Sequence, residues 1–336
     1  MHIPDNYLGP ATCAIMGAAV LPAWVLSARK VTRELSRERI PLLGIGAAFS
    51  FLIMMLNVPV PGGTTAHAVG GTLLAVLLGP WAACISISTA LLIQALVFGD
   101  GGILSFGANC FNMAFVIPFF GYFIYKIAKD RVRSRRGEYI GLAIASYAGI
   151  NLAALCAAIE FGLQPLVARD AAGLPLYSPY PLSVSIPAMT IPHLAVAGVV
   201  EAAFTVAIFA FVAKASPGAI YIGSPARTKP LYALIVALVL ASPIGLLAAG
   251  SAWGEWGPGE IKSVVIGGKS LGFVPAGMDR GFHFPAPIPD YGLKGFPGIF
   301  GYALSALLGV AIFIIAYKLF GLLKKGKKED AVKAGA

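Results

Sequence analysis

Long apolar runs separated by short polar breaks follow one another along almost the whole chain. Several runs are about 17 to 25 residues long, which is the length that an α-helix needs to cross roughly 30 Å of hydrocarbon. The pattern predicts an all-α polytopic membrane protein with about nine hydrophobic helical segments, embedded in a lipid bilayer. We expect these segments at residues 9–28, 40–59, 68–79, 81–98, 106–127, 137–162, 190–214, 229–249 and 298–321.

The basic residues indicate how these segments are oriented. They form clusters at 29–39, 126–136, 214–229 and 324–328. Cytoplasmic loops carry an excess of Lys and Arg, so all of these clusters are expected inside the cell. A single helix through 68–98 would put the first two clusters on opposite sides, whereas a break at Gly79-Pro80 puts both on one side. We therefore predict a short segment that ends at this break, with the N-terminus outside and the C-terminus inside.

Composition supports a membrane protein and excludes several other classes. Of the 336 residues, 58% are hydrophobic and only 12% are charged, which is far from the balance of a soluble domain. The net charge of +10 comes from short clusters without interleaved aromatic residues, so no nucleic-acid partner is expected. The four cysteines lie in apolar segments without a CxxC pair, which implies neither a disulfide framework nor a zinc site. No cationic leader precedes the first apolar run, and Met1 is expected to be the true N-terminus.

The stretch "PVPGGTTAH" that ends at His67 interrupts this apolar pattern. The segment that follows it, 68–79, has about 12 residues and is too short to span a bilayer unless protein surrounds its non-helical approach. Broken elements of this kind often mark the ligand site of a membrane protein. The orientation above places His67 on the outer side, together with Met1.

His2 gives the start of the chain a chemistry that an internal histidine lacks. Short links join the α-amine of Met1, the amide nitrogen of His2 and the imidazole Nδ1 of His2, so one metal can take all three in two nearly flat chelate rings. Planar nitrogen coordination favours nickel(II) or copper(II) over zinc or magnesium. His67 could fill the remaining position, which makes Met1, His2 and His67 the candidate metal ligands. Free termini usually fray, and a terminus that is ordered as a metal ligand needs burial. The segment "MHIPDNYL" is therefore expected to insert into the helix bundle. The alternative is a His2 that has no role.

Other polar side chains have either a role at the metal site or an ordinary structural role. Glu201 lies deep in a predicted span, where it either has a functional or coupling role or makes a buried hydrogen bond. Glu160 lies near an outer helix end, where it could reach water. His193 is interpreted as solvated, with a metal ligand as the alternative, and His283 as solvated, with capture of metal near the entrance as the alternative. Asp100 is interpreted as a turn residue or, alternatively, as a rim carboxylate that attracts cations. Amides near the outer ends of the spans either orient metal-binding imidazoles or join helices. They are Asn57, Gln94, Asn109 and Asn112.

Three stretches resemble the NikM/CbiM family, the substrate-binding membrane subunits of energy-coupling-factor nickel and cobalt importers. They read "MHIPDNYLGPATC", "NVPVPGGTTAHAVGGTLLAVLLGPWAA" and "QALVFGDGGILSFGANCFNMA". The resemblance covers roughly residues 1–215, and it implies that the amine of Met1, the amide and imidazole of His2, and His67 hold the metal. The "HIPDN" start is more similar to nickel members than to cobalt members. The resemblance also implies a transmembrane coupling subunit (NikQ/CbiQ type) and ATPase subunits (NikO/CbiO type) as partners.

The chain from Lys229 onward resembles the small NikN/PDGLE-type partner, which is fused to the metal-binding subunit in some members. The usual Pro-Asp-Gly-Leu motif reads "PDYGL" here, because Tyr291 stands between Asp290 and Gly292. We expect a metal-binding membrane domain at 1–215 and a cytoplasmic linker at 216–228. A two-helix hairpin at 229–336 follows, with an external loop at 250–297.

These observations favour a transport subunit over an enzyme. No GxxxxGK[ST] loop is present, so there is no ATP site on this chain and the energy for uphill import must come from partner subunits. Nickel(II) is the expected transported substrate, and cobalt(II) is the alternative within the same family. An intramembrane metalloenzyme is a rival hypothesis, but the chain has no HExxH motif and a filled planar site leaves little room for a reactive water. A channel or a regulatory scaffold is a further rival.

Overall fold

The computed structural model describes residues 1–36, 39–60, 64–132, 134–220, 227–248, 250–266 and 269–334. Within these residues, seven helices are long and apolar enough to cross a membrane. They are Pro10–Glu34, Pro80–Phe98, Phe106–Arg131, Arg135–Val167, Leu182–Ala215, Thr228–Leu247 and Gly298–Leu322. Two shorter apolar helices, Ile40–Met55 and Gly71–Leu78, complete the bundle. The prediction of an all-α polytopic membrane protein is confirmed.

Several of the long helices are continuous runs of more than one element. The α-helices are α1 (Pro10–Glu34), α2 (Ile40–Met55), α3 (Gly71–Leu78), α4 (Pro80–Ile93), α5 (Phe106–Asn109), α6 (Ile117–Arg131), α7 (Arg135–Val167), α8 (Leu182–Pro192), α9 (Gly198–Ala215), α10 (Thr228–Ala241), α11 (Pro258–Ile261), α12 (Ala276–Asp279) and α13 (Gly298–Ala334). Short π-helical segments, η2 (Gln94–Phe98), η3 (Cys110–Val116) and η4 (His193–Ala197), interrupt or extend them, and the 3-10 turns are η5 (Pro217–Ala219), η6 (Ser242–Leu247) and η7 (Pro289–Tyr291). The strands are β1 (Val58–Val60), β2 (Thr64–Ala66), β3 (Val265–Ile266) and β4 (Lys269–Ser270), paired as two antiparallel hairpins.

Glycine sets both ends of the half-length helix α3. Gly70, which precedes it, has φ +73°, and Gly79, which follows it, has φ +87°. These left-handed backbone conformations suit glycine, and Pro80 at the start of α4 loses no hydrogen bond by lacking an N–H. The predicted break at Gly79-Pro80 is therefore present, and α3 is a short element whose first five residues are buried inside the bundle.

One predicted boundary is wrong. Residues 163–189, which lie between the predicted spans 137–162 and 190–214, contain the end of α7 and most of α8, so the second of these spans already begins at Leu182. Pro187 and Pro192 lie inside this helix, where proline usually indicates a break. The π-helical segment η4 follows directly and keeps the helix continuous into α9.

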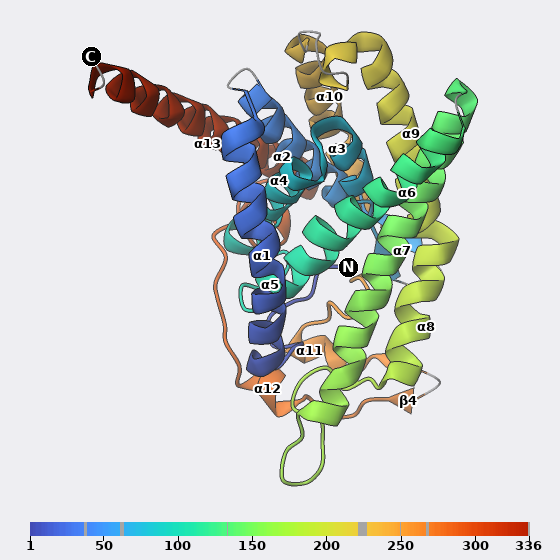
Figure 1. The fold of residues 1–336 in the computed structure, drawn as a ribbon. Coiled ribbons are helices and arrows are strands. Elements are labelled where there is room, and N and C mark those ends of the chain that lie inside the picture. The colour runs from blue at the N-terminus through green and yellow to red at the C-terminus, as the bar shows by residue number, and fades with distance from the viewer. Residues whose placement is uncertain are drawn as a thin grey trace.

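The chain start lies in the middle of the bundle, and the segment before α13 closes one end of it (Figure 1). Helices α10 and α13 both pack against α2, which joins the C-terminal helices to the rest of the bundle. The Gly- and Pro-rich segment that connects α10 to α13 is bonded to earlier parts of the chain. The carbonyl of Trp256 accepts from the hydroxyl of Tyr7, and the N–H of Gly277 donates to the carbonyl of Leu176. The Gly- and Pro-rich segment is therefore packed over the chain start.

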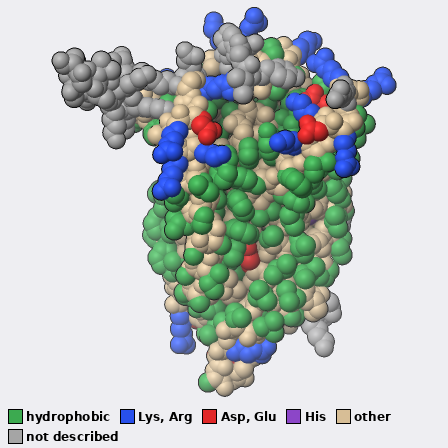
Figure 2. Space-filling model, viewed as in Figure 1, with side chains coloured by type: hydrophobic (Ala, Val, Ile, Leu, Met, Phe, Trp, Pro, Cys, Tyr) green, Lys and Arg blue, Asp and Glu red, His purple; other side chains and the backbone are tan. Residues whose placement is uncertain are grey.

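Hydrophobic side chains cover the middle of the visible face, and most of its Lys and Arg side chains gather at one end (Figure 2). Arg29, Lys30 and Arg33 in the last turns of α1 and Lys129 and Arg131 at the end of α6 belong to these clusters. An apolar belt with one basic end is the pattern of a bilayer-spanning protein. The positive-inside rule assigns the basic end to the cytoplasm, and this orientation stays a prediction.

Candidate metal centre

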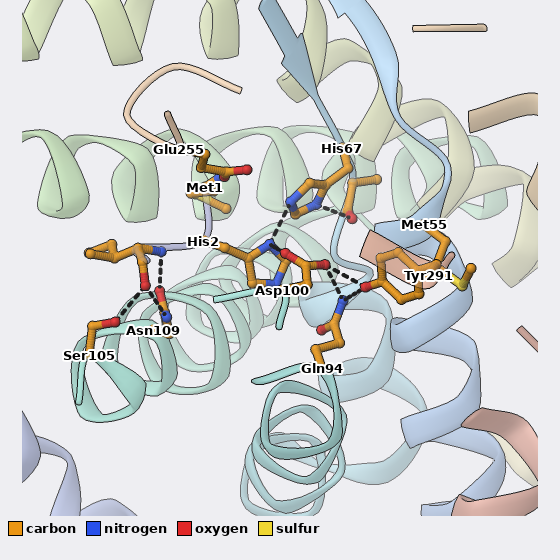
Figure 3. A network of polar contacts seen from close by, with 12 residues as sticks. Met1, His2, Met55, His67, Gln94, Asp100, Ser105, Asn109, Glu255 and Tyr291 are labelled. Atoms are coloured by element: carbon orange, nitrogen blue, oxygen red, sulfur yellow. Dashed lines mark hydrogen bonds and ion pairs between the residues drawn. The ribbon is translucent and has the colours of Figure 1, made fainter. Parts of the chain in front are cut away.

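The first residues of the chain are inside the protein. The exposed fractions of Met1, His2 and Ile3 are 3%, 2% and 0%. The side chain of Asn109 binds both backbone groups of Ile3, because its Oδ1 accepts the N–H at 2.7 Å and its Nδ2 donates to the carbonyl at 3.0 Å (Figure 3). The hydroxyl of Ser105 donates to the same carbonyl. The expected insertion of the N-terminus is therefore present, and a segment a hundred residues further along the chain holds it.

The next residues turn the chain back toward α1. The carboxylate of Asp5 accepts the N–H groups of Ile103 and Leu104 at 3.0 and 2.7 Å. Asn6 has φ +66°, a left-handed conformation that Asn tolerates better than most residues, and its side chain binds the backbone of Phe282 at both the N–H and the carbonyl. These contacts fix the direction in which the chain start enters the bundle.

His67 follows the β1–β2 hairpin and is 4% exposed. Its Nδ1 lies 3.1 Å from the carbonyl oxygen of Ala68. A carbonyl can only accept, so Nδ1 carries the ring hydrogen and Nε2 keeps a free lone pair. Burial lowers the pKa of His67 well below its usual value, and the ammonium of Met1 and His2 lower it further. The imidazole is therefore neutral, which is the form that binds metals.

The two imidazoles face each other across a short gap (Figure 3). His2 Nδ1 lies 3.2 Å from His67 Nε2 and 3.2 Å from Asp100 Oδ1. Both of these neighbours are acceptors, so His2 carries its ring hydrogen on Nδ1. Its Nε2 is buried without a hydrogen-bond partner, and in the described part of the chain no hydrogen bond engages the amide N–H of His2.

This spacing is close to that of two ligands on one planar metal. Two nitrogens at adjacent corners of a square, each about 2 Å from the metal, are about 2.8 Å apart. In the proposed chelate, His67 Nε2 would be adjacent to His2 Nδ1 and opposite the amide nitrogen. The amine of Met1 lies with Glu255, whose Oε1 is 2.9 Å from it. A movement of a few tenths of an ångström would bring the two imidazoles to the spacing of planar ligands. The amine of Met1 would also have to leave the carboxylate of Glu255.

A hydrogen-bond network holds Asp100, the carboxylate that contacts His2. Tyr291 donates its hydroxyl hydrogen to Oδ2 of Asp100, and Gln94 Nε2 donates to that same oxygen at 3.0 Å and to the Tyr291 hydroxyl at 2.9 Å. Burial, followed by the charge of Asp100, raises the pKa of Tyr291 well above its usual value, so the hydroxyl keeps its proton. A cavity of about 360 Å³ lies against this network. Its lining includes His2, His67, Asp100, Glu255, Asp290 and Tyr291.

The sequence interpretation missed this network. Asp100 was expected to act in a turn or at a rim, but it contacts the imidazole of His2 directly. Tyr291 was visible only as a departure from the Pro-Asp-Gly-Leu motif. An aromatic residue inserted into a motif is a signal of a local contact, but the sequence does not reveal that the contact lies 191 positions away.

Two further interpretations are wrong. Glu160 does not reach water, because it is 6% exposed and its Oε2 accepts from Asn112 Nδ2 at 2.9 Å. His193 is 5% exposed rather than solvated, and its Nδ1 lies 2.7 Å from the carbonyl of Met189. Glu160 lies in α7 and His193 in η4, and neighbouring parts of the bundle bury both side chains. His283, in contrast, is exposed as expected.

The amides fall into different roles. Asn109 holds the backbone of Ile3, Gln94 binds Asp100 and Tyr291, and Asn112 binds Glu160. Asn57 lines the cavity beside the two histidines. The hydrogen bonds of these amides orient the chain start or Asp100 and join helices, and none of them reaches an imidazole in the described residues.

Fold and site together define a multi-pass helical membrane protein that encloses its own chain start in a nitrogen-rich centre. Residues 2–219 match the family model for CbiM, the cobalt uptake substrate-specific transmembrane region, and residues 227–326 match that for the PDGLE domain. The chain belongs to the CbiM family, with a PDGLE region following the CbiM region. The resemblance inferred from the motifs is confirmed in both parts, including the part that carries Tyr291.

Relatives of known name are similar over nearly the full length. The chain is 51% identical over 319 residues to the probable fused nickel transport protein LarMN of Lactiplantibacillus plantarum, which covers 94% of this chain and 96% of that one. It is 49% identical over 332 residues to the fused nickel transport protein NikMN of Rhodobacter capsulatus, with 94% and 95% covered. A crystal structure of a truncated transition metal transporter is similar with a TM-score of 0.60 and 55% identity, over 63% of this chain and 98% of that one.

Proposed function

We propose that this chain is the substrate-binding membrane subunit of an energy-coupling-factor importer and captures nickel(II) in a square-planar centre. The ligands are the amine of Met1, the amide nitrogen and Nδ1 of His2, and Nε2 of His67. Family membership makes the chain a membrane component for nickel or cobalt transport rather than an enzyme. The observation that carries the finer proposal is the 3.2 Å separation of His2 Nδ1 and His67 Nε2 at a chain start that is 2% exposed.

Loading exchanges protons for the metal. The ammonium of Met1 leaves Glu255 and gives up a proton, and the amide of His2 gives up its own. The ring hydrogen of His2 has to move from Nδ1 to Nε2, which has no partner to oppose it. Asp100 Oδ1 lies 3.2 Å from Nδ1, so it is placed to accept the hydrogen that leaves this nitrogen. His67 presents a bare Nε2 and needs no change of protonation.

The planar nitrogen set selects the metal. A deprotonated amide and a flat arrangement favour nickel(II), and the fused relatives carry nickel in their names. Cobalt(II) is the second candidate, because the family model is described by cobalt uptake. Four protein nitrogens fill the plane and leave no in-plane position for a reactive water, which argues against an intramembrane metalloenzyme.

The two regions of the chain have separate tasks in this proposal. The domain at 1–215 supplies all the ligands. The domain at 229–336, joined by a cytoplasmic linker at 216–228, covers them from outside with its loop at 250–297, which contributes Glu255 and Tyr291. The N-terminus is outside and the C-terminus inside the plasma membrane. A coupling subunit of the NikQ/CbiQ type and ATPase subunits of the NikO/CbiO type provide the energy, because the 336 residues contain no phosphate-binding loop motif.

Blocking the α-amine tests the chelate directly. Acetylation of the α-amine of Met1 keeps every side chain but removes the amine nitrogen as a ligand. We expect the acetylated chain to lose tight nickel binding and the absorption band of planar nickel, as His2→Ala and His67→Ala also should. His283→Ala, at an exposed histidine in the external loop, is the matched control and should bind as the parent chain does. Unchanged binding in the acetylated chain, with the acetyl group verified by mass spectrometry, would refute the planar chelate.

A further inference from the structure

Glu201 makes an unusual contact in the interior of the bundle. It belongs to α9 and is 0% exposed. Its Oε2 accepts the N–H of Val69 at 2.7 Å, and both of its oxygens lie 3.0 Å from the N–H of Gly70. The sequence analysis left open whether Glu201 has a role or merely a buried hydrogen bond. The position of its two partners decides this question.

Val69 and Gly70 connect His67 to the first turn of α3. The N–H groups at the start of a helix have no partner within the helix, and a carboxylate satisfies them well because the helix dipole is positive there. Here the carboxylate comes from a helix more than 130 residues away in sequence, so it attaches the segment behind His67 to α9.

Other contacts of the same segment leave it little freedom. The hydroxyl of Ser50 on α2 donates to the carbonyl of Val69 at 2.8 Å. Gly70 lies so close to the ring of Phe49 that an added Cβ would be 2.6 Å from it. Val69 is therefore held from both sides, by Glu201 at its N–H and by Ser50 at its carbonyl. His67 is only two residues away.

The helix that carries Glu201 also contacts the strand that leads to His67. Ala197, the last residue of the π-helical segment η4, packs with Val60 and Ala66 of the β-hairpin. A π-helical turn shifts the register of the residues that follow it, and such turns are frequent at functional sites. The η4–α9 unit thus contacts the chain on both sides of His67, at Ala66 and at Val69.

We propose that Glu201 is a positioning residue for the metal centre: through Val69 and Gly70 it holds His67 at the fourth corner of the plane. This inference rests on the proposed function, because it assigns Glu201 to the ligand that completes that centre. A buried carboxylate in a membrane interior is costly unless it is fully bonded. A residue that only joined helices could be a neutral amide. Here both carboxylate oxygens lie 3.0 Å from the N–H of Gly70, so either orientation of an amide would set its NH₂ group against that donor.

The test compares two buried glutamates. In Glu201→Gln the amide keeps the size of the side chain, but its NH₂ group must face an N–H donor, so the segment behind His67 has to shift. We expect nickel affinity to fall about 10- to 100-fold, the usual effect of residues that orient a metal ligand. Glu160→Gln is the matched control, because Glu160 is also buried but binds the side chain of Asn112 instead. Its nickel affinity should stay within about twofold of the parent.

A double variant separates positioning from general damage. In the His67→Ala background there is no ligand left for Glu201 to place, so adding Glu201→Gln should cause no further loss of nickel affinity. A further loss equal to that in the parent background would overturn the inference, as would parent-like affinity and absorption in Glu201→Gln alone. Thermal unfolding of the metal-free variants checks that the single glutamine variants are folded to the same extent.

Failure of the proposed function gives a different result. If His67→Ala binds nickel as the parent does, the planar centre is wrong and Glu201 has no metal ligand to position. If His67→Ala loses binding while Glu201→Gln does not, the centre stands and only the role of Glu201 is refuted. Nickel titration of the single variants His67→Ala and Glu201→Gln side by side therefore distinguishes the two failures.

Discussion

The hydroxyl of Tyr291 donates a hydrogen bond to the carboxylate of Asp100, and this contact joins the C-terminal part of the chain to the proposed metal centre. The other oxygen of Asp100 lies 3.2 Å from His2 Nδ1. Phe98 stacks on the Tyr291 ring, with the centroids 4.8 Å apart, and fixes its place. A residue of the PDGLE region thus reaches a proposed ligand through one intermediate side chain.

Tyr291→Phe should weaken this junction without removing a ligand. The variant deletes one hydrogen bond to the partly buried carboxylate of Asp100 and leaves Gln94 with one acceptor fewer. We expect a loss of about 1–3 kcal/mol in the free energy of unfolding of the metal-free protein. Hydrogen exchange should rise at residues 99–105 and 289–293. Nickel affinity should change less than in His67→Ala.

Tyr139→Phe is the control for this substitution. Tyr139 packs edge-on against Phe209, and its hydroxyl makes no hydrogen bond in the described part of the chain. The change should leave stability and exchange unaltered. Equal effects of the two substitutions would show that Asp100 does not depend on Tyr291.

Proton release offers a measurement of the loading chemistry. In the proposed centre, the amine and the amide each give up a proton on binding, whereas the ring hydrogen of His2 only changes position. The pKa of His67, lowered by burial, keeps that imidazole neutral well below the usual histidine range, so it adds no proton at neutral pH. We therefore expect about two protons to be released for each nickel bound.

Calorimetry in buffers of different ionisation enthalpy measures this number. Affinity should fall as the pH is lowered from about 7.5 to 6, with a slope of about two in log units, because protons compete with the metal for the amine and the amide. His67 would add to the slope only below its lowered pKa. Release of no protons would contradict coordination by the amide.

Asn109→Ala should release the chain start. Its side chain binds both the N–H and the carbonyl of Ile3, the residue after His2. Its loss leaves the buried N–H of Ile3 without this partner, which costs about 1–3 kcal/mol of stability, whereas the carbonyl keeps the hydroxyl of Ser105 and the N–H of Gly102. We expect nickel affinity to fall about 10- to 100-fold, because His2 is then poorly placed.

Asn151→Ala is the matched control for Asn109→Ala. Asn151 Nδ2 donates to the carbonyl of Tyr147 within α7, away from the chain start. Its replacement should leave nickel binding unchanged. Equal losses in the two variants would show that Asn109 acts through the bundle as a whole and not through Ile3.

Much of the fold could be predicted from the sequence, because span length and charge depend on local composition. The break at Gly79-Pro80 followed from counting the membrane crossings between the basic clusters. The same count predicted that His67 lies on the same side of the membrane as Met1. The start of α8 could not be predicted in the same way. Pro187 and Pro192 indicate a break, but the π-helical segment and packing against α7 keep the helix intact.

The supporting residues of the centre were less visible in the sequence than its ligands. The three candidate ligands form a recognisable chelate on chemical grounds alone. Asp100, Tyr291 and Glu201 act through contacts between residues far apart in the chain. A residue's type does not reveal a distant partner, so a buried Glu or an inserted Tyr could be noted in the sequence but not explained.

Gly70→Ala tests whether the backbone behind His67 has to be left-handed. Gly70 has φ +73°, where an L-residue with a Cβ is strained, and the new methyl group would lie 2.6 Å from the ring of Phe49. Two penalties therefore act at once, and we expect a loss of about 1–3 kcal/mol in stability together with weaker nickel binding. Gly17→Ala on α1 is the control, since a Cβ there meets nothing within 4 Å and alanine favours a helix. Thermal unfolding and nickel titration of both variants provide the measurement. If Gly70→Ala unfolds at the parent temperature and binds nickel normally, the segment between His67 and α3 is not the rigid support that the Glu201 and Ser50 contacts require.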